Sequence, residues 1–67
     1  MRPLTGKELA KILEKRGWQL ARIHSSHHVY VKPGRIERIS VPIHGNKQLG
    51  PGLQSFLLKS AGIEVES

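Results

Sequence analysis

The stretch WQLARIHSSHHVYVK, residues 18–32, contains two strand-like runs on either side of a pair of serines. Both runs are rich in β-branched and aromatic side chains, which predicts strands at 18–24 and 27–32. A two-residue loop at Ser25-Ser26 places His24 and His27 opposite each other on one face of a hairpin, with Cβ atoms about 5 Å apart. That loop geometry usually favours Asn-Gly or a glycine, which a pair of serines does not supply.

The alternation of side chains along the second run separates its two histidines. Neighbours in a strand point to opposite faces, so His27 and His28 cannot serve one site on one face of the sheet. The two valines of HHVYV share a face with His27, and Tyr30 shares the other face with His28. We expect Tyr30 to point inward and His27 outward, because a catalytic base has to reach its substrate.

A third strand follows, and a helix precedes the hairpin. Apolar and polar side chains alternate in ERISVPI, residues 37–43, and Pro42 indicates an edge position or the end of that strand. The first helix begins with a capping box between Thr5 and Glu8, and Gly17 suits the left-handed position after its last turn.

Residues 51–63 predict a second helix that begins with Pro51 in its first turn. Its buried stripe is expected at Leu53, Phe56, Leu57 and Ala61. The order α-β-β-β-α predicts an α+β fold, in which a three-stranded antiparallel sheet carries two helices on one face. The other face is then free to meet a partner, and residues 1–67 are expected to form a single domain.

The chain is small and strongly basic. It has 67 residues and no cysteine, so neither a disulfide nor a thiolate-held metal reinforces its apolar core. Eleven Lys and Arg against five Glu give a formal net charge of +6, which indicates a polyanionic partner, with nucleic acid first. The basic residues are spread over several elements, so no membrane partner is expected. The N-terminus has no apolar signal-like segment, and we expect a cytoplasmic protein.

The shortage of carboxylates bears on metal chemistry. The chain has no Asp, and its Glu residues are scattered at positions 8, 14, 37, 64 and 66. Nucleases that use two magnesium ions need clustered carboxylates as oxygen ligands. If this chain cleaves nucleic acid, we therefore expect it to do so without a metal ion or another cofactor.

Four histidines lie at positions 24, 27, 28 and 44, and three interpretations of them compete. A metal site needs a third and a fourth ligand, and His44 is the only obvious spare. A structural role, in which the rings bond backbone groups, suits His24 and His44 best. In the third interpretation one histidine is a catalytic acid or base acting on RNA, because an unperturbed imidazole titrates near neutral pH.

Four segments in order, SSHHVYVKPG, ISVPIHG, LGPG and LLKSAGI, resemble the HicA toxins of type II toxin–antitoxin systems. The likeness covers nearly the whole chain and preserves the order and spacing of the motifs. It implies a fold like the double-stranded-RNA-binding domain, metal-independent cleavage of mRNA, and inhibition by a HicB-type antitoxin protein. The family's catalytic histidine, in its Gly-Ser-His motif, corresponds to His27 here, with His24, His28 and Ser26 as candidate auxiliary residues.

The sequence departs from the family pattern in two segments. Ser25 stands where the family usually has glycine, so we expect strain in the turn that presents His27. Leu53, Gln54 and Ser55 replace a more usual Thr-Leu-Arg at the second helix. We therefore expect a phosphate-binding arginine or a helix-start hydroxyl to be missing there.

RNA cleavage makes modest chemical demands, because RNA carries its own nucleophile, the 2′-hydroxyl group. His27 as general base would contribute about 10²–10⁴-fold, and basic side chains would stabilise the charge that develops on the phosphate. The candidate RNA-binding residues are Lys7, Lys11, Arg22, Lys32, Arg35, Arg38 and Lys47. The alternatives are a double-stranded-RNA-binding module of the same fold without catalysis, and a protein that only pairs with a regulator.

Overall fold

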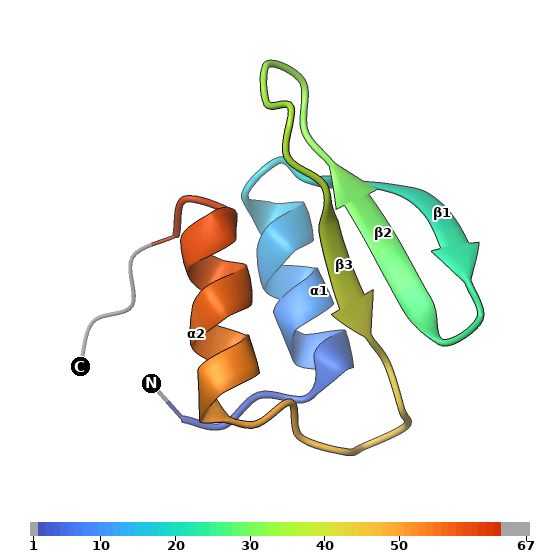
Figure 1. Ribbon diagram of the computed structural model, residues 1–67, viewed down its shortest axis with the longest axis vertical. Coiled ribbons are helices and arrows are strands. Elements are labelled where there is room, and N and C mark those ends of the chain that lie inside the picture. Colours follow the sequence, from blue (N-terminus) through green and yellow to red (C-terminus); the bar gives the residue numbers. More distant parts are fainter. Residues whose placement is uncertain (1, 64–67) are drawn as a thin grey trace.

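The computed structural model describes residues 2–63 and has the predicted order α-β-β-β-α (Figure 1). Its elements are α1 (Gly6–Lys15), β1 (Gln19–His24), β2 (His27–Val31), β3 (Ile39–Pro42) and α2 (Pro51–Ser60). The strands form one antiparallel sheet in the order β1-β2-β3, so β1 and β3 are its edges. The predicted α+β fold is therefore confirmed.

Both helices pack on the same face of the sheet. Figure 1 shows α1 behind β3 and α2 beside it. On this side Tyr30, Ile39 and Val41 are at most 2 % exposed. They share one hydrophobic core with leucines of both helices, among them Leu9, Leu13, Leu57 and Leu58. Neither described helix covers the opposite side of the sheet, which we call the open face.

β1 and β2 form the predicted hairpin, with Ser25-Ser26 as its two-residue loop. His24 pairs directly with His27 across this loop. Ser25 has a φ of 56°, in the left-handed region that glycine adopts freely. A residue with a side chain is strained there by about 1–2 kcal/mol. The loop thus has the strained geometry expected when serine replaces glycine.

β3 is shorter than predicted. The expected strand covered residues 37–43, but pairing begins at Ile39 and ends at Pro42, which has no N–H to extend the ladder. Pro42 therefore lies on an edge strand and also at its end. The N–H of Ile43 leaves the sheet and donates to the carbonyl oxygen of Ser26 at 2.8 Å, which ties the end of β3 to the hairpin loop.

α1 begins and ends as predicted. The Thr5 hydroxyl oxygen accepts from the Glu8 N–H at 3.2 Å, and the Glu8 carboxylate accepts from the Thr5 N–H at 3.0 Å, which completes the capping box. Gly17 follows the helix with a φ of 92°. Trp18 was expected in the first strand, but it is buried in the core and β1 begins one residue later.

The buried side of α2 differs from the prediction. The expected stripe was wrong at Leu53, which is 39 % exposed, and at Phe56, which is 65 % exposed. Leu57 and Ala61 are buried as predicted, and Gln54 and Leu58 are buried in place of Leu53 and Phe56. Neither described helix has the length and apolar character that crossing a bilayer requires.

Gln54 explains why the stripe was misplaced. Its Oε1 accepts from the Leu4 N–H at 2.7 Å, and its Nε2 donates to the Arg2 carbonyl oxygen at 3.1 Å. A polar side chain is tolerated in a protein interior when its hydrogen bonds are satisfied. The amide of Gln54 therefore joins α2 to the segment that precedes α1, a role that a hydrophobic pattern does not reveal.

Gly6, the first residue of α1, packs against the end of β3. A Cβ atom added to Gly6 would collide with the Pro42 carbonyl oxygen and would lie 3.1 Å from the Ile43 Cα atom. Both neighbours are backbone atoms that cannot rotate away. We therefore expect Gly6→Ala to lower the free energy of unfolding by about 1–3 kcal/mol, and the melting temperature by roughly 5–20 °C.

Gly52→Ala is the matched control for this prediction. Gly52 lies in the first turn of α2, and an added Cβ atom meets nothing within 4 Å. Because alanine has the higher helix propensity, this variant should keep or slightly raise the melting temperature. Thermal unfolding followed by circular dichroism compares the two variants, and equal melting temperatures would contradict the close contact at Gly6.

Candidate active site on the open face of the sheet

His27 lies on the open face, at the beginning of β2. The strand register places on this face the side chains of Gln19, Arg22, His24, His27, Val29, Val31, Ser40 and Pro42. His27 is exposed, whereas Tyr30 of the same strand is buried in the core. The prediction that His27 points outward and Tyr30 inward is therefore confirmed.

His24 closes the hairpin directly opposite His27. The two residues are cross-strand partners and both are exposed. Such partners carry their side chains on one face, with Cβ atoms about 5 Å apart. The next open-face pair is Arg22 with Val29, about 7 Å further along the strands. The open face therefore brings together two imidazoles and one guanidinium group.

His28 lies on the opposite side of the sheet from His27. It pairs with Ile23 of β1 and with Val41 of β3, whose side chain is fully buried. His28 itself is partly buried. The predicted separation of the two neighbouring histidines is confirmed, and His28 is directed away from any substrate held against the open face.

The loop between β3 and α2 begins beside the hairpin. It starts at Ile43, whose N–H bonds the Ser26 carbonyl oxygen, and the carbonyl oxygen of His44 then accepts from the Lys47 N–H at 3.0 Å. Lys47 is exposed on this loop. Two of the predicted RNA-binding residues, Arg22 and Lys47, therefore belong to the segments that meet at the hairpin end of the sheet.

Three other predicted RNA-binding residues, Lys32, Arg35 and Arg38, belong to the connection between β2 and β3. This connection lies at the opposite end of the sheet from the hairpin loop (Figure 1). Lys32 was expected within the second strand but begins the connection instead. Arg38 ends it, four residues before Pro42, the β3 partner of His27, which corresponds to about 13 Å along the strand. The structure does not bring these three residues to His27.

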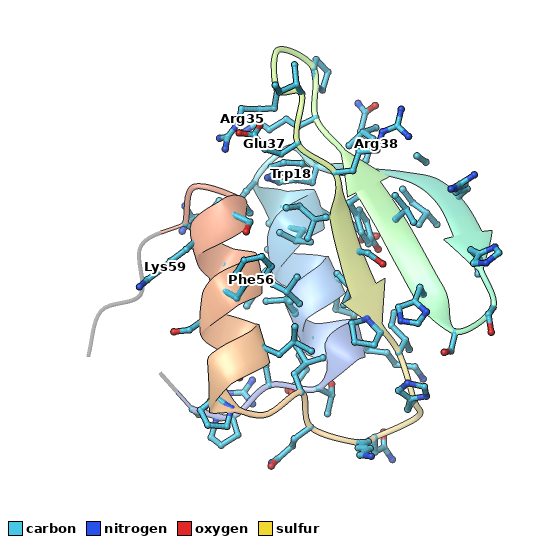
Figure 2. The ribbon with its side chains drawn as sticks, in the orientation of Figure 1. Trp18, Arg35, Glu37, Arg38, Phe56 and Lys59 are labelled. Carbon is cyan, nitrogen blue, oxygen red and sulfur yellow. The ribbon has the colours of Figure 1, made fainter. Side chains whose placement is uncertain are left out.

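Arg35 is held by contacts within the protein. Its Nε donates to Glu37 Oε1 at 3.0 Å, and its Nη2 donates to the Ser60 carbonyl oxygen at the end of α2 at 3.2 Å. Its guanidinium carbon lies 5.7 Å from the centre of the Trp18 ring, a cation–π distance (Figure 2). The hydrogen bond from Arg35 lowers the pKa of Glu37. These contacts tie the connection to α2, and RNA binding by Arg35 stays a prediction.

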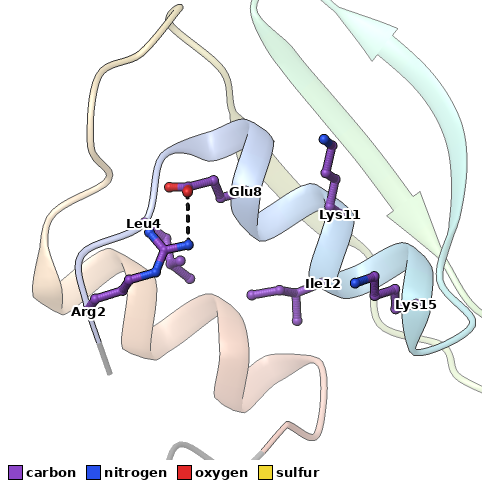
Figure 3. Close-up of a pocket in the computed structure, with 6 residues that line it drawn as sticks. All are labelled: Arg2, Leu4, Glu8, Lys11, Ile12 and Lys15. Atoms are coloured by element: carbon purple, nitrogen blue, oxygen red, sulfur yellow. Dashed lines mark ion pairs between the residues drawn. The ribbon is translucent and has the colours of Figure 1, made fainter.

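Lys7 and Lys11 belong to α1, on the helix side of the sheet. Figure 3 shows a surface pocket on α1 that is lined by Arg2, Leu4, Glu8, Lys11, Ile12 and Lys15. Within it, Arg2 Nη2 lies 3.0 Å from Glu8 Oε2, so one of its three cations is paired. The hydrogen bond from the Thr5 N–H, together with Arg2, lowers the pKa of Glu8. This basic pocket and the open-face histidines lie on different layers of the fold.

Ser40 is an open-face residue that was not predicted as part of a site. It lies on β3, directly beside Val29 of β2. The signal for it was the alternation in ERISVPI, because Ile39 and Val41 can only both point inward if Ser40 points outward. Ser40 adds a hydroxyl group to the surface that carries His27.

A metal site is not formed by the histidines of the described residues. Within residues 2–63 no group of three or more His, Cys, Asp or Glu side chains lies close enough to hold a metal ion. His44, the spare ligand considered from the sequence, therefore does not complete a site with His24 and His27.

Comparison with models of known protein families identifies the family of this chain. A family model described as the HicA toxin of bacterial toxin–antitoxin matches residues 6–63. The chain belongs to the HicA toxin family. The match runs from the first residue of α1 past the end of α2, so it includes every described helix and strand of this HicA chain. A comparison with curated protein sequences gives no match. As a HicA family member the chain is a toxin, and the family implies an antitoxin partner.

Proposed function

We propose that this HicA toxin is an endoribonuclease that cleaves mRNA in the cytoplasm without a metal ion. The observation that carries the proposal is the position of His27. It is exposed on the open face, at the position that the family resemblance assigns to the catalytic histidine, and Arg22 lies one open-face pair away. No described helix blocks the approach of a polymer to this surface.

In the proposed reaction RNA supplies the nucleophile. His27 accepts the proton of the 2′-hydroxyl group while the 2′-oxygen attacks the adjacent phosphorus atom. The bond from phosphorus to the 5′-oxygen of the next nucleotide breaks, and this oxygen takes up a proton as it leaves. The products are a 2′,3′-cyclic phosphate and a 5′-hydroxyl group. Arg22 is the cation best placed to stabilise the negative charge that develops on the phosphate oxygens.

Binding of double-stranded RNA without cleavage is the second candidate. Lys11 and Lys15 line the pocket on α1, outside the open face. Lysines on a helix can grip backbone phosphates by charge alone, and double-stranded RNA is recognised largely by shape and backbone. In that function the imidazoles of the open face would be dispensable.

We expect the purified protein to cleave end-labelled mRNA at an unchanged rate in excess EDTA. The reason is the donor set, since the chain has neither Cys nor Asp and residues 2–63 hold no three-ligand cluster. The products should carry 2′,3′-cyclic phosphate and 5′-hydroxyl ends, which enzymatic end-labelling detects. Activity that disappears in EDTA and returns with magnesium or zinc would refute the metal-free reaction. Binding without any cleavage would favour the second candidate.

A further inference from the structure

The open face holds a second imidazole, that of His24, which has no part in the reaction proposed above. His24 is the cross-strand partner of His27 in the pair that closes the two-residue loop. Their Cβ atoms are about 5 Å apart, and side chains of such a pair project in the same direction. Both residues are exposed, so a phosphate group that reaches one ring also reaches the other.

We propose that His24 is a second catalytic residue, which donates a proton to the leaving 5′-oxygen while His27 accepts the proton of the 2′-hydroxyl group. The inference rests on the proposed ribonuclease function. Each turnover removes one proton from the 2′-oxygen and adds one to the 5′-oxygen, so the two transfers balance. His27 ends protonated and His24 neutral, and exchange of protons with water restores the pair.

The other groups near the hairpin do not fit this role. His28 faces the helix side of the sheet, and the guanidinium group of Arg22 is suited to binding a phosphate group. Tyr30 is buried and its hydroxyl donates to Glu14 Oε2 at 2.9 Å. Burial and this hydrogen bond raise the pKa of Tyr30 to about 12. His24 is the remaining titratable side chain that shares the open face with His27.

The surroundings of the pair suit a phosphate substrate. Among the open-face positions of the three strands, Arg22 on β1 is the single permanently charged residue, while β2 and β3 contribute Val29, Val31, Ser40 and Pro42. No carboxylate occupies these positions, so no side chain there repels an anionic phosphate group. The guanidinium group of Arg22 attracts it. The guanidinium of Arg22 and the imidazole of His24 lie two residues apart on the same strand face.

The test uses two RNA substrates that differ in one atom, the bridging 5′-oxygen or a 5′-sulfur at the cleavage site. A thiolate leaves without being protonated, so it needs no general acid. We expect His24→Gln to slow cleavage of the oxygen substrate by about 10²–10⁴-fold, and to cleave the sulfur substrate at close to the wild-type rate. His27→Ala should be slow on both substrates, because the 2′-hydroxyl group still has to be deprotonated.

A purely structural role for His24 predicts a different result, because a distorted site would slow both substrates equally. His44→Gln is the control for loss of an imidazole from the loop after β3, outside the three strands, and it should cleave both substrates at the wild-type rate. Equal losses on the two substrates, or wild-type cleavage of the oxygen substrate by His24→Gln, would overturn the inference. If the wild-type protein itself cleaves neither substrate, the proposed function fails first, and this inference fails with it.

Discussion

His27→Ala should abolish RNA cleavage and toxicity while leaving the protein folded. A general base typically contributes about 10²–10⁴-fold, and its loss removes the group that deprotonates the nucleophile. His27 is exposed at the first position of β2 and is not part of the core. Substitution of an exposed side chain usually changes the free energy of unfolding by no more than about 0.5 kcal/mol. Growth after induction, mRNA integrity and thermal unfolding of the purified variant measure these effects.

His28→Ala is the matched control, because it removes an imidazole from the neighbouring position on the opposite side of the sheet. His28 is partly buried against Val41, so its loss should cost about 1 kcal/mol of stability and leave the rate of RNA cleavage nearly unchanged. The two variants therefore separate catalysis from folding. Folded variants that lose activity to the same extent would contradict the opposite placement of the two side chains, and full activity in His27→Ala would end its assignment.

The parts of the fold that follow from local sequence were predicted well. The capping box of α1 links two residues three positions apart, so its pattern is visible in TGKE. The hairpin register was also local, since a two-residue loop leaves one way to pair His24 with His27. The open-face pair of the candidate site could therefore be placed before the structure was known.

The parts that depend on distant residues could not be predicted in the same way. Gln54 is buried because its amide bonds backbone groups of Arg2 and Leu4, which are about fifty positions away in the chain. The sequence shows Arg35 only as one of several basic residues. In the structure it donates hydrogen bonds to Glu37 and to the end of α2. Polar and charged side chains find such partners only once the helices and the sheet have packed.

The distribution of basic side chains around His27 also depends on the tertiary structure, so the sequence alone did not predict it. Seven Lys and Arg were candidates for RNA binding, and charge alone did not rank them. Pairing of β1 with β2 places Arg22 on the open face next to the histidines, whereas the course of β3 places Arg38 at the far end of the sheet. The strand pairing therefore decides which basic residues lie near His27 and which lie far from it.

Co-expression of the antitoxin should restore growth, and the purified complex should no longer cleave RNA. A free mRNA nuclease would destroy the messages of its own cell, and membership of the HicA family implies an antitoxin partner. The chain carries a formal net charge of +6, and the proposed reaction requires RNA to reach its open face. An antitoxin that presents acidic side chains to this face would be steered to it by complementary charge and would exclude RNA at the same time.

Charge reversal on the two sides of the molecule tests where the antitoxin docks. Arg22→Glu places a negative charge beside His24 and His27, so it should slow association with the antitoxin about tenfold or more at low salt. Lys59→Glu makes the same change on α2, away from the open face (Figure 2), and should associate nearly as fast as the wild type. Surface plasmon resonance measures both rates, and His27 should become protected from chemical modification in the complex. A complex that forms and still cleaves RNA at the rate of the free toxin would show that occlusion of the open face is the wrong mechanism, and that control acts on expression of the toxin instead.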